Sequence, residues 1–194
     1  MPPLNIILAS ASPRRRELLK LIFGAFRVTP SEFEESLVPS ELGPGEHVLY
    51  SASAKTRDVA ARFPDSLVIG ADTIVVIDDI ILGKPTDAAD AARMLQMLSG
   101  RTHRVYTGVA VALGERERAG VECTEVTFGE LSDEIISRYI ASGEPMDKAG
   151  TYAIQGKGAV LIKSVRGCYP NVVGLPLYLL SELLREFGVE PLCE

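Results

Sequence analysis

The chain has 194 residues, 46% hydrophobic and 24% charged, which is enough to bury a full core as one domain over residues 1–194. Its 20 basic and 26 acidic side chains give a formal net charge of −6, which disfavours a general surface for nucleic acid or for anionic membranes. Three widely spaced cysteines, no basic leader and no apolar run of membrane-spanning length predict a cytoplasmic protein without a membrane partner.

The first elements are predicted to be a strand, a turn and a helix. Residues 4–8 form an apolar run typical of a buried strand, while Ser12 and Pro13 suit the N-cap and first position of a helix. Ser10 lies in the small-residue turn between them, where backbone and hydroxyl groups can approach a ligand closely. The order of elements predicts a loop that can receive an anion.

Three consecutive arginines open this helix, at the end where the backbone already carries positive partial charge. Helical spacing places Arg14 and Arg15 on the side of the apolar stripe and leaves Arg16 in solvent. Guanidinium groups can grip phosphate with a planar fork, so Arg14 and Arg15 predict a phosphate site. A solvated basic turn is the alternative, since charge runs are often only exposed.

A strand at residues 26–29, an acidic loop and a helix at residues 46–62 are expected next. Lys55 occupies a position on the apolar stripe of that helix, which indicates either a snorkelling lysine or a cation projecting toward phosphates. In the loop, Glu34 and Glu35 are either solvated or able to supply a ligand for a divalent metal ion.

Residues 67–77 and 80–82 are predicted to form a hairpin around Asp78 and Asp79. Asp72 interrupts the apolar strand, which is costly for a buried carboxylate unless a cation, a metal or hydrogen-bond donors accompany it; a bulge is the alternative. A two-residue turn would set Ile77 opposite Ile80, and the same register would bring Lys84 to the level of Thr73, beside Asp72. Lys84 is therefore a candidate phosphate ligand, with a plain surface lysine as the alternative.

The remaining chain alternates between helical and strand patterns, which favours an α/β fold with a mixed, twisted sheet and flanking helices. Helices are expected at residues 88–98, 132–141 and 177–187, and strands at residues 105–113, 121–128 and 159–165. Gln155 lies beside two glycines, where an amide can read the edge of a base, although this signal is weak by itself.

Taken together, these residues resemble the Maf proteins, a family of nucleotide pyrophosphatases, over almost the whole chain. The resemblance rests on seven strings in order: SASPRRRELL from Ser10, SAKTRDVA around Lys55, IGADTIV from Ile69, GKP from Gly83, LSGRTH from Leu98, GEPMDKAGTYAIQG from Gly143 and NVVGLP from Asn171. It implies a fold related to inosine triphosphate pyrophosphatases, with two lobes around a cleft, in a homodimer.

The resemblance also implies hydrolysis of a nucleoside triphosphate to the monophosphate and pyrophosphate with a divalent cation, Mg²⁺ or Mn²⁺. The family's catalytic aspartate matches Asp72, its phosphate-handling residues match Ser10, Arg15, Lys55 and Lys84, and an acidic position that helps to hold metal matches Glu35.

Within this family, the branch that acts on dTTP and UTP has counterparts of Arg14, Thr73 and Gln155, so the resemblance implies a pyrimidine nucleotide. Two other enzymatic readings stay open: a pyrophosphatase for 7-methyl-GTP, and one of broad specificity. A nucleotide-sensing regulator of cell division is an alternative of another class, and a nucleic-acid-binding module is disfavoured by the acidic composition.

Overall fold

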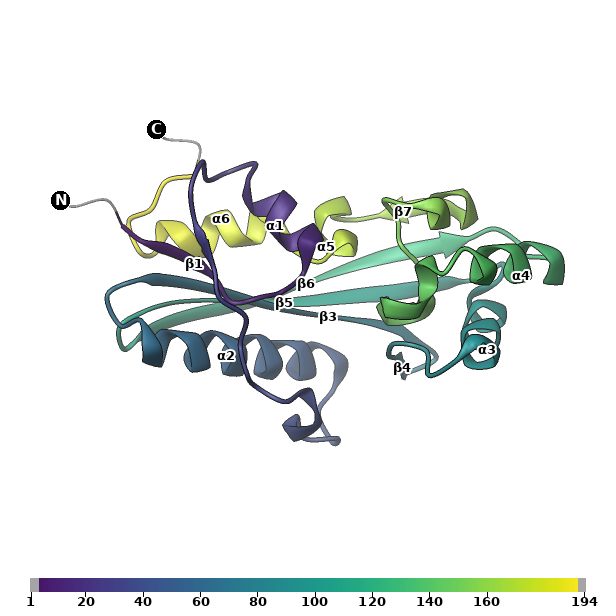
Figure 1. The fold of residues 1–194 in the computed structure, drawn as a ribbon, viewed down its shortest axis with the longest axis horizontal. Helices are drawn as coiled ribbons and strands as arrows, with labels where there is room; N and C mark the ends of the chain where they lie inside the picture. The colour runs from purple at the N-terminus through teal and green to yellow at the C-terminus, as the bar shows by residue number, and fades with distance from the viewer. Residues whose placement is uncertain (1–3, 192–194) are drawn as a thin grey trace. The chain divides into compact units, whose positions relative to one another are not determined.

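A computed structural model describes residues 4–191 (Figure 1). Within them, seven strands form one sheet in the order β2 (Arg27–Val28), β1 (Ile6–Leu8), β3 (Leu67–Ile77), β5 (Thr102–Leu113), β6 (Arg116–Phe128) and β7 (Ile162–Arg166), with β4 (Ile80–Leu82) paired to β3. β1 runs parallel to β2 and β3, whereas β3 with β4 and β6 with β7 are antiparallel. The fold is therefore α/β with a mixed sheet, as the sequence predicts.

The α-helices are α1 (Pro13–Leu19), α2 (Pro44–Arg62), α3 (Ala88–Leu98), α4 (Asp133–Ala141), α5 (Tyr169–Val173) and α6 (Leu177–Arg185). Short 3₁₀ helices are η1 (Glu35–Leu37), η2 (Glu144–Asp147), η3 (Ala149–Thr151) and η4 (Lys157–Leu161). No helix between residues 4 and 191 has both the length and the apolar character to cross a membrane.

The described chain divides into two compact units. The first contains residues up to Asp72, residues 107–122 and the chain from Gly174 onward; the second contains residues 73–106 and 123–173. The prediction of a single domain, with two lobes around a cleft, stays a prediction.

In the first unit, α2 covers one face of the sheet and α1 and α6 cover the other (Figure 1). Two glycines allow α2 to approach closely. A Cβ on Gly70 of β3 would overlap the Thr56 hydroxyl, and a Cβ on Gly108 of β5 would collide with the Val48 backbone. The Thr56 hydroxyl donates to the Ala52 carbonyl at 2.8 Å within α2. This close contact fixes the side of α2 that carries Lys55.

In the second unit, the hairpin has the predicted register: Ile77 pairs with Ile80, and Val75 pairs with Leu82. Asp78 and Asp79 both have positive φ, 50° and 62°, which is the conformation of a type I′ turn. The helix α3 packs against α4, and its Leu95 belongs to a buried core that also contains Leu82 of the hairpin. The expected pairing does not reach Lys84, because β4 ends at Leu82.

Several boundaries differ from expectation. The first helix ends at Leu19, although the apolar stripe continues to Phe23. β5 and β6 begin earlier than predicted, at Thr102 and Arg116. The strand predicted at residues 159–165 is wrong in its first part, because residues 157–161 form η4 and the extended chain begins at Ile162. Local β-branched composition therefore does not decide the conformation there.

Candidate active site

The centre of the candidate site is an ammonium group between two carboxylates in the first unit. Lys55 Nζ donates to Asp72 Oδ1 at 2.6 Å and to Glu35 Oε1 at 2.6 Å. The side chains of Lys55 and Asp72 are only 11% and 9% exposed, while that of Glu35 is 66% exposed. The nearly buried Asp72 thus has the cationic partner that its apolar surroundings require, and Glu35 closes the cluster on the solvent side.

Arg15 is held beside this cluster by main-chain carbonyls. Its Nε donates to the Gly174 carbonyl at 2.8 Å, and its Nη1 donates to the Ala71 carbonyl at 2.8 Å and to Ser10 Oγ at 3.2 Å. Ser10 is itself buried, and its hydroxyl also accepts from the Ser12 amide at 3.2 Å. The guanidinium plane is therefore fixed before any ligand arrives, which lowers the entropic cost of gripping an anion.

The field around Arg15 comes from the same carboxylates. Burial lowers the pKa of Arg15, Asp72 and Glu35 raise it again, and Arg14 lowers it further, so that the net shift is downward. Arg14 therefore lies close enough to act on Arg15 electrostatically. Within residues 4–191, the guanidinium of Arg14 makes no hydrogen bond or ion pair, so its donors remain available to a bound anion.

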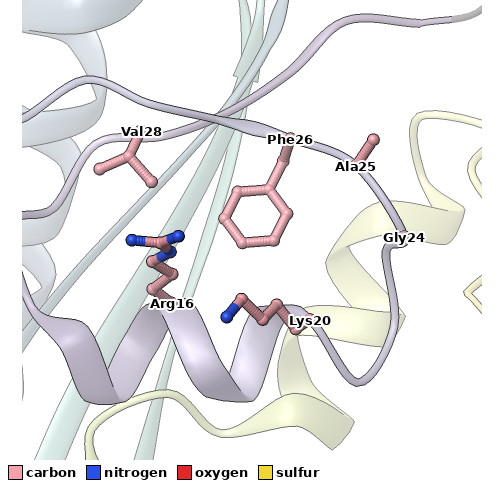
Figure 2. Close-up of a pocket in the computed structure, with 6 residues that line it drawn as sticks. All are labelled: Arg16, Lys20, Gly24, Ala25, Phe26 and Val28. Carbon is pink, nitrogen blue, oxygen red and sulfur yellow. The ribbon is translucent and has the colours of Figure 1, made fainter.

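Arg16 lies apart from this group, as predicted. Figure 2 shows Arg16 of α1 and Lys20, which caps the C-terminus of that helix, facing Phe26 and Val28. These residues line a hollow of about 450 Å³. Lys20 is also paired with Glu17 at 2.7 Å on the surface of the helix. The three successive arginines are thus divided: Arg15 lies in the field of Asp72, Arg14 acts on Arg15, and Arg16 lines the separate hollow.

Local structure explains how Glu35 reaches Lys55. Asp58, one turn after Lys55 on α2, accepts hydrogen bonds at Oδ2 from the Ser31 hydroxyl at 2.8 Å and the Glu32 amide at 2.9 Å. Although burial alone would raise the pKa of Asp58, these donors and Arg62 hold it below its ordinary value. Asp58 thereby ties the acidic loop to the helix that carries Lys55.

Three further predicted residues belong to the second unit. Thr73 directly follows Asp72 in β3 and is half-buried. Lys84 is exposed, just beyond β4, and its ammonium has no hydrogen-bond or ion-pair partner in the described part of the chain. Gln155 is exposed in a turn closed by the Gly156 amide, which donates to the Ala153 carbonyl at 3.2 Å. Their roles toward a substrate remain predictions.

The carboxylates near Lys55 show whether the site could hold the expected divalent cation. Among residues 4–191, there is no group of three or more His, Cys, Asp or Glu side chains arranged to hold a metal ion. Glu35 and Asp72 do share one cationic partner, and Glu35 is open to solvent. Mg²⁺ at phosphate sites typically takes one or two carboxylates and completes its shell with phosphate oxygens and water. The residues present therefore fit a cation that arrives with a polyphosphate.

Sequence reasoning missed the parts of the site that act through the main chain. The carbonyls of Ala71 and Gly174 anchor Arg15, and residue type carries no signal for such contacts. Gly174 has a φ of 121°, which favours glycine, so the glycine in NVVGLP is the one available hint. Asp58 was also missed, because a carboxylate on a helix is ordinarily solvated.

Comparison with known proteins covers nearly the entire chain. The relatives named dTTP/UTP pyrophosphatase include the three that follow. The protein of Moorella thermoacetica is 54% identical over 96% of both chains. The protein of Gloeobacter violaceus is 51% identical over 94% of this chain and 96% of its own. The protein of Bacillus cytotoxicus is 51% identical over 94% of this chain and 95% of its own.

Solved structures show a related fold at low sequence identity. The Ham1 protein of Staphylococcus aureus covers 94% of this chain and 99% of its own, with 14% identity and a TM-score of 0.54. A HAM1 protein from Coxiella burnetii covers 95% of this chain and 100% of its own, with 18% identity and a TM-score of 0.52. The model of the Maf-like protein family matches residues 5–187. The chain therefore belongs to the Maf-like protein family.

Proposed function

We propose that the chain hydrolyses dTTP and UTP to the nucleoside monophosphate and pyrophosphate. The observation that carries this proposal is the contact of Lys55 with Asp72 and Glu35, next to the anchored guanidinium of Arg15. Relatives about half identical over nearly full length are named for the same activity. Clustered cations around a nearly buried carboxylate suit phosphoryl transfer, because the negative charge of the phosphates must be neutralised and the attacking water must be oriented.

The triphosphate is bound chiefly by charge. Arg15 is already oriented by Ser10 and the two carbonyls, and Arg14 offers uncommitted donors beside it. Lys55 adds an ammonium that pairs with Asp72 before the substrate binds. Lys84, which the family resemblance assigns to phosphate handling, is proposed as a further cation for the phosphates. Spreading the negative charge over these groups stabilises the developing charge on the departing pyrophosphate.

Asp72 activates the water. The carboxylate accepts a proton as the water oxygen attacks the α-phosphorus, and the bond from that phosphorus to the bridging oxygen breaks as pyrophosphate leaves. Lys55, at 2.6 Å from Asp72 Oδ1, orients the carboxylate and balances its charge. The low exposure of Asp72 limits competing solvent, so the carboxylate is directed at one water molecule.

Glu35 would hold a divalent cation, Mg²⁺ or Mn²⁺, together with phosphate oxygens. When bound, such a cation supplies positive charge to the phosphate oxygens. The exposed position of Glu35 at the edge of the Lys55 cluster supports this role.

Thr73 and Gln155 select the base. A hydroxyl and an amide can hydrogen-bond the O2, N3 and O4 edge of uracil or thymine. A base with a different donor pattern would leave one of these groups without its partner, which costs affinity. We therefore expect UTP and dTTP to be preferred to CTP and 7-methyl-GTP.

We further propose that the protein works in the cytoplasm as a homodimer. Few cysteines suit a reducing compartment, and the family that the chain resembles is usually dimeric. Light scattering on the purified protein measures the assembly, and a mass of one chain would contradict the dimer.

The deciding experiment is to incubate the purified protein with UTP, dTTP, CTP, GTP and 7-methyl-GTP in Mg²⁺ or Mn²⁺ and to identify the products. We expect equal amounts of pyrophosphate and UMP or dTMP. Binding without release of pyrophosphate would overturn the enzymatic proposal and favour a nucleotide-sensing regulator. Release of orthophosphate would place the attack at another phosphorus atom.

A further inference from the structure

The turn that carries Gln155 is tied to the rest of the second unit by one carboxylate. Glu144 Oε2 accepts from the Lys157 amide at 2.9 Å, and Glu144 Oε1 accepts from the Gly158 amide at 2.9 Å. Both amides lie just after Gln155 in the chain. One half-buried side chain at the start of η2 therefore holds the C-terminal side of the turn by two charge-assisted hydrogen bonds.

Tyr139 of α4 holds the other side. Its hydroxyl donates to Glu144 Oε1 at 2.9 Å and accepts from the Ala153 amide at 3.1 Å. Ala153 lies two residues before Gln155. Tyr139 and Glu144, which we call the turn clamp, thus fix the backbone on both sides of Gln155, although neither is part of the turn itself.

The glycines of the turn are shaped to fit the clamp. A Cβ on Gly156 would overlap the Glu144 carboxyl, with Cδ only 2.6 Å away. A Cβ on Gly158 would lie 2.7 Å from the Tyr139 hydroxyl and 2.8 Å from the Ala153 carbonyl. These contacts are closer than side chains tolerate, so the QGKG sequence leaves the space that the clamp occupies.

The carboxylate form of Glu144 is the form that this arrangement favours. Although burial alone would raise the pKa of Glu144, the Gly158 and Lys157 amides and the Tyr139 hydroxyl hold it below its ordinary value. An ionised carboxylate only accepts hydrogen bonds, and all three groups that face it are donors. The clamp is therefore fully matched in its donors and acceptors.

We propose that Glu144 and Tyr139 are positioning residues that set the base preference by fixing the backbone on both sides of Gln155. The inference rests on the proposed function, in which Gln155 reads the base. A side-chain amide discriminates between bases only when its orientation is fixed, because a mobile amide can turn to satisfy either donor pattern. Loss of the clamp therefore loosens selection between bases and leaves phosphate binding intact.

The principal test is Tyr139→Phe, which removes one hydroxyl at nearly constant volume. We expect the ratio of kcat/KM for UTP to that for CTP to fall about tenfold, with most of the change in the KM for UTP. The inhibition constant of inorganic pyrophosphate, a probe of phosphate binding, is expected to stay unchanged. Tyr178→Phe, at an exposed position of α6, is the matched control.

A double-mutant cycle separates positioning through Gln155 from a general structural effect. In a Gln155→Ala background, Tyr139→Phe should cause no further change in the UTP to CTP ratio, because the group that it positions is gone. Glu144→Gln repeats the test at the other member of the clamp, since an amide in place of the carboxylate brings a donor against donors. Thermal unfolding of each variant identifies any that no longer fold.

The outcomes distinguish the inference from the function on which it rests. If Gln155→Ala changes the ratio and both clamp variants, correctly folded, do not, the clamp has no role in selection. If the two effects add in full, Tyr139 acts independently of Gln155 and the inference is overturned. If wild-type protein releases no pyrophosphate, the proposed function fails, and the affinities for UMP and CMP, which need no turnover, test the clamp by the same ratio.

Discussion

The ammonium of Lys55 and the carboxylate of Asp72 form a contact of 2.6 Å in which both side chains are about one-tenth exposed. Burying two opposite charges costs desolvation energy, so such a pair gives little net stability and is weak as a purely structural device. Lys55 also contacts Glu35, whose side chain is exposed to solvent. This combination favours a chemical role over a structural one.

Asp72→Asn tests that role. We expect kcat for UTP and dTTP to fall by at least about 100-fold, because the amide cannot take the proton of the attacking water. The KM should not rise, since removing a negative charge beside Arg15 and Lys55 favours a triphosphate. Steady-state kinetics at saturating Mg²⁺ measure both constants.

A matched control for this substitution is Asp79→Asn, at the exposed turn of the hairpin, where asparagine tolerates the positive φ of 62°. It should keep wild-type kinetics. Near-normal turnover of Asp72→Asn on every nucleotide would contradict the assignment. Full recovery of rate at high metal concentration would instead identify Asp72 as a metal ligand.

Glu35→Gln tests the proposed metal ligand. The amide oxygen binds Mg²⁺ more weakly than a carboxylate does, so the concentration of Mg²⁺ needed for half-maximal rate should rise about tenfold. Activity measured against Mg²⁺ concentration at fixed nucleotide gives this value. The neighbouring Glu34→Gln should leave the curve unchanged. If the Mg²⁺ dependence of Glu35→Gln were the same as that of Glu34→Gln and of the wild type, Glu35 would not be a metal ligand.

Gly174→Ala tests the anchoring of Arg15. At a φ of 121°, a side chain strains the backbone, and the carbonyl that accepts from Arg15 Nε shifts with it. We expect the free energy of unfolding to fall by about 1–3 kcal/mol and the KM for UTP to rise. Urea denaturation and kinetics measure the two effects.

The control for Gly174→Ala is Gly24→Ala, because an added Cβ at Gly24 meets no atom within 4 Å. It should change neither quantity appreciably. A Gly174→Ala variant with lowered stability and an unaltered KM would mean that Arg15 keeps its orientation without this carbonyl.

The sequence predicted that charged residues in apolar segments, whose burial costs desolvation energy, belong to the site. Asp72 in an apolar strand and Lys55 on an apolar helix face each need a compensating partner, and the structure pairs them with each other. The register of the hairpin was also predicted correctly from the sequence, because two aspartates between β-branched runs favour a tight turn. In these cases the local pattern and the tertiary structure agree.

Contacts that depend on backbone geometry could not be predicted. Arg15 and the Gly174 carbonyl are 159 positions apart, and nothing in the residue type of either one specifies the other. Residues 159–161 show the complementary failure. They are predicted to begin a strand, but the Lys157 and Gly158 amides just before them donate to Glu144, and residues 157–161 form η4. Tertiary partners override local preference at both places.

The burial of His103 leads to a prediction of how the free energy of unfolding depends on pH. It is 2% exposed in the second unit, contacts Tyr152 through Nε2 at 2.8 Å, and burial lowers its pKa to about 4 from 6.5. Between these values the unfolded chain binds a proton that the folded chain does not, so stability falls as the pH drops from 6.5 toward 4. The full loss is about 3 kcal/mol.

Urea denaturation at pH 4.5, 5.5, 6.5 and 7.5 measures this dependence, with His103→Gln removing the titrating group. Carboxylates also destabilise the fold in acid, but they are common to both proteins, so the difference between the two curves isolates His103. We expect that variant to be less stable at pH 7.5 and to lose less on acidification. The same substitution at His47, which is half-exposed on α2, is the control. If His103→Gln keeps the wild-type slope, the buried imidazole does not titrate differently on unfolding, and the acid sensitivity lies in the carboxylates alone.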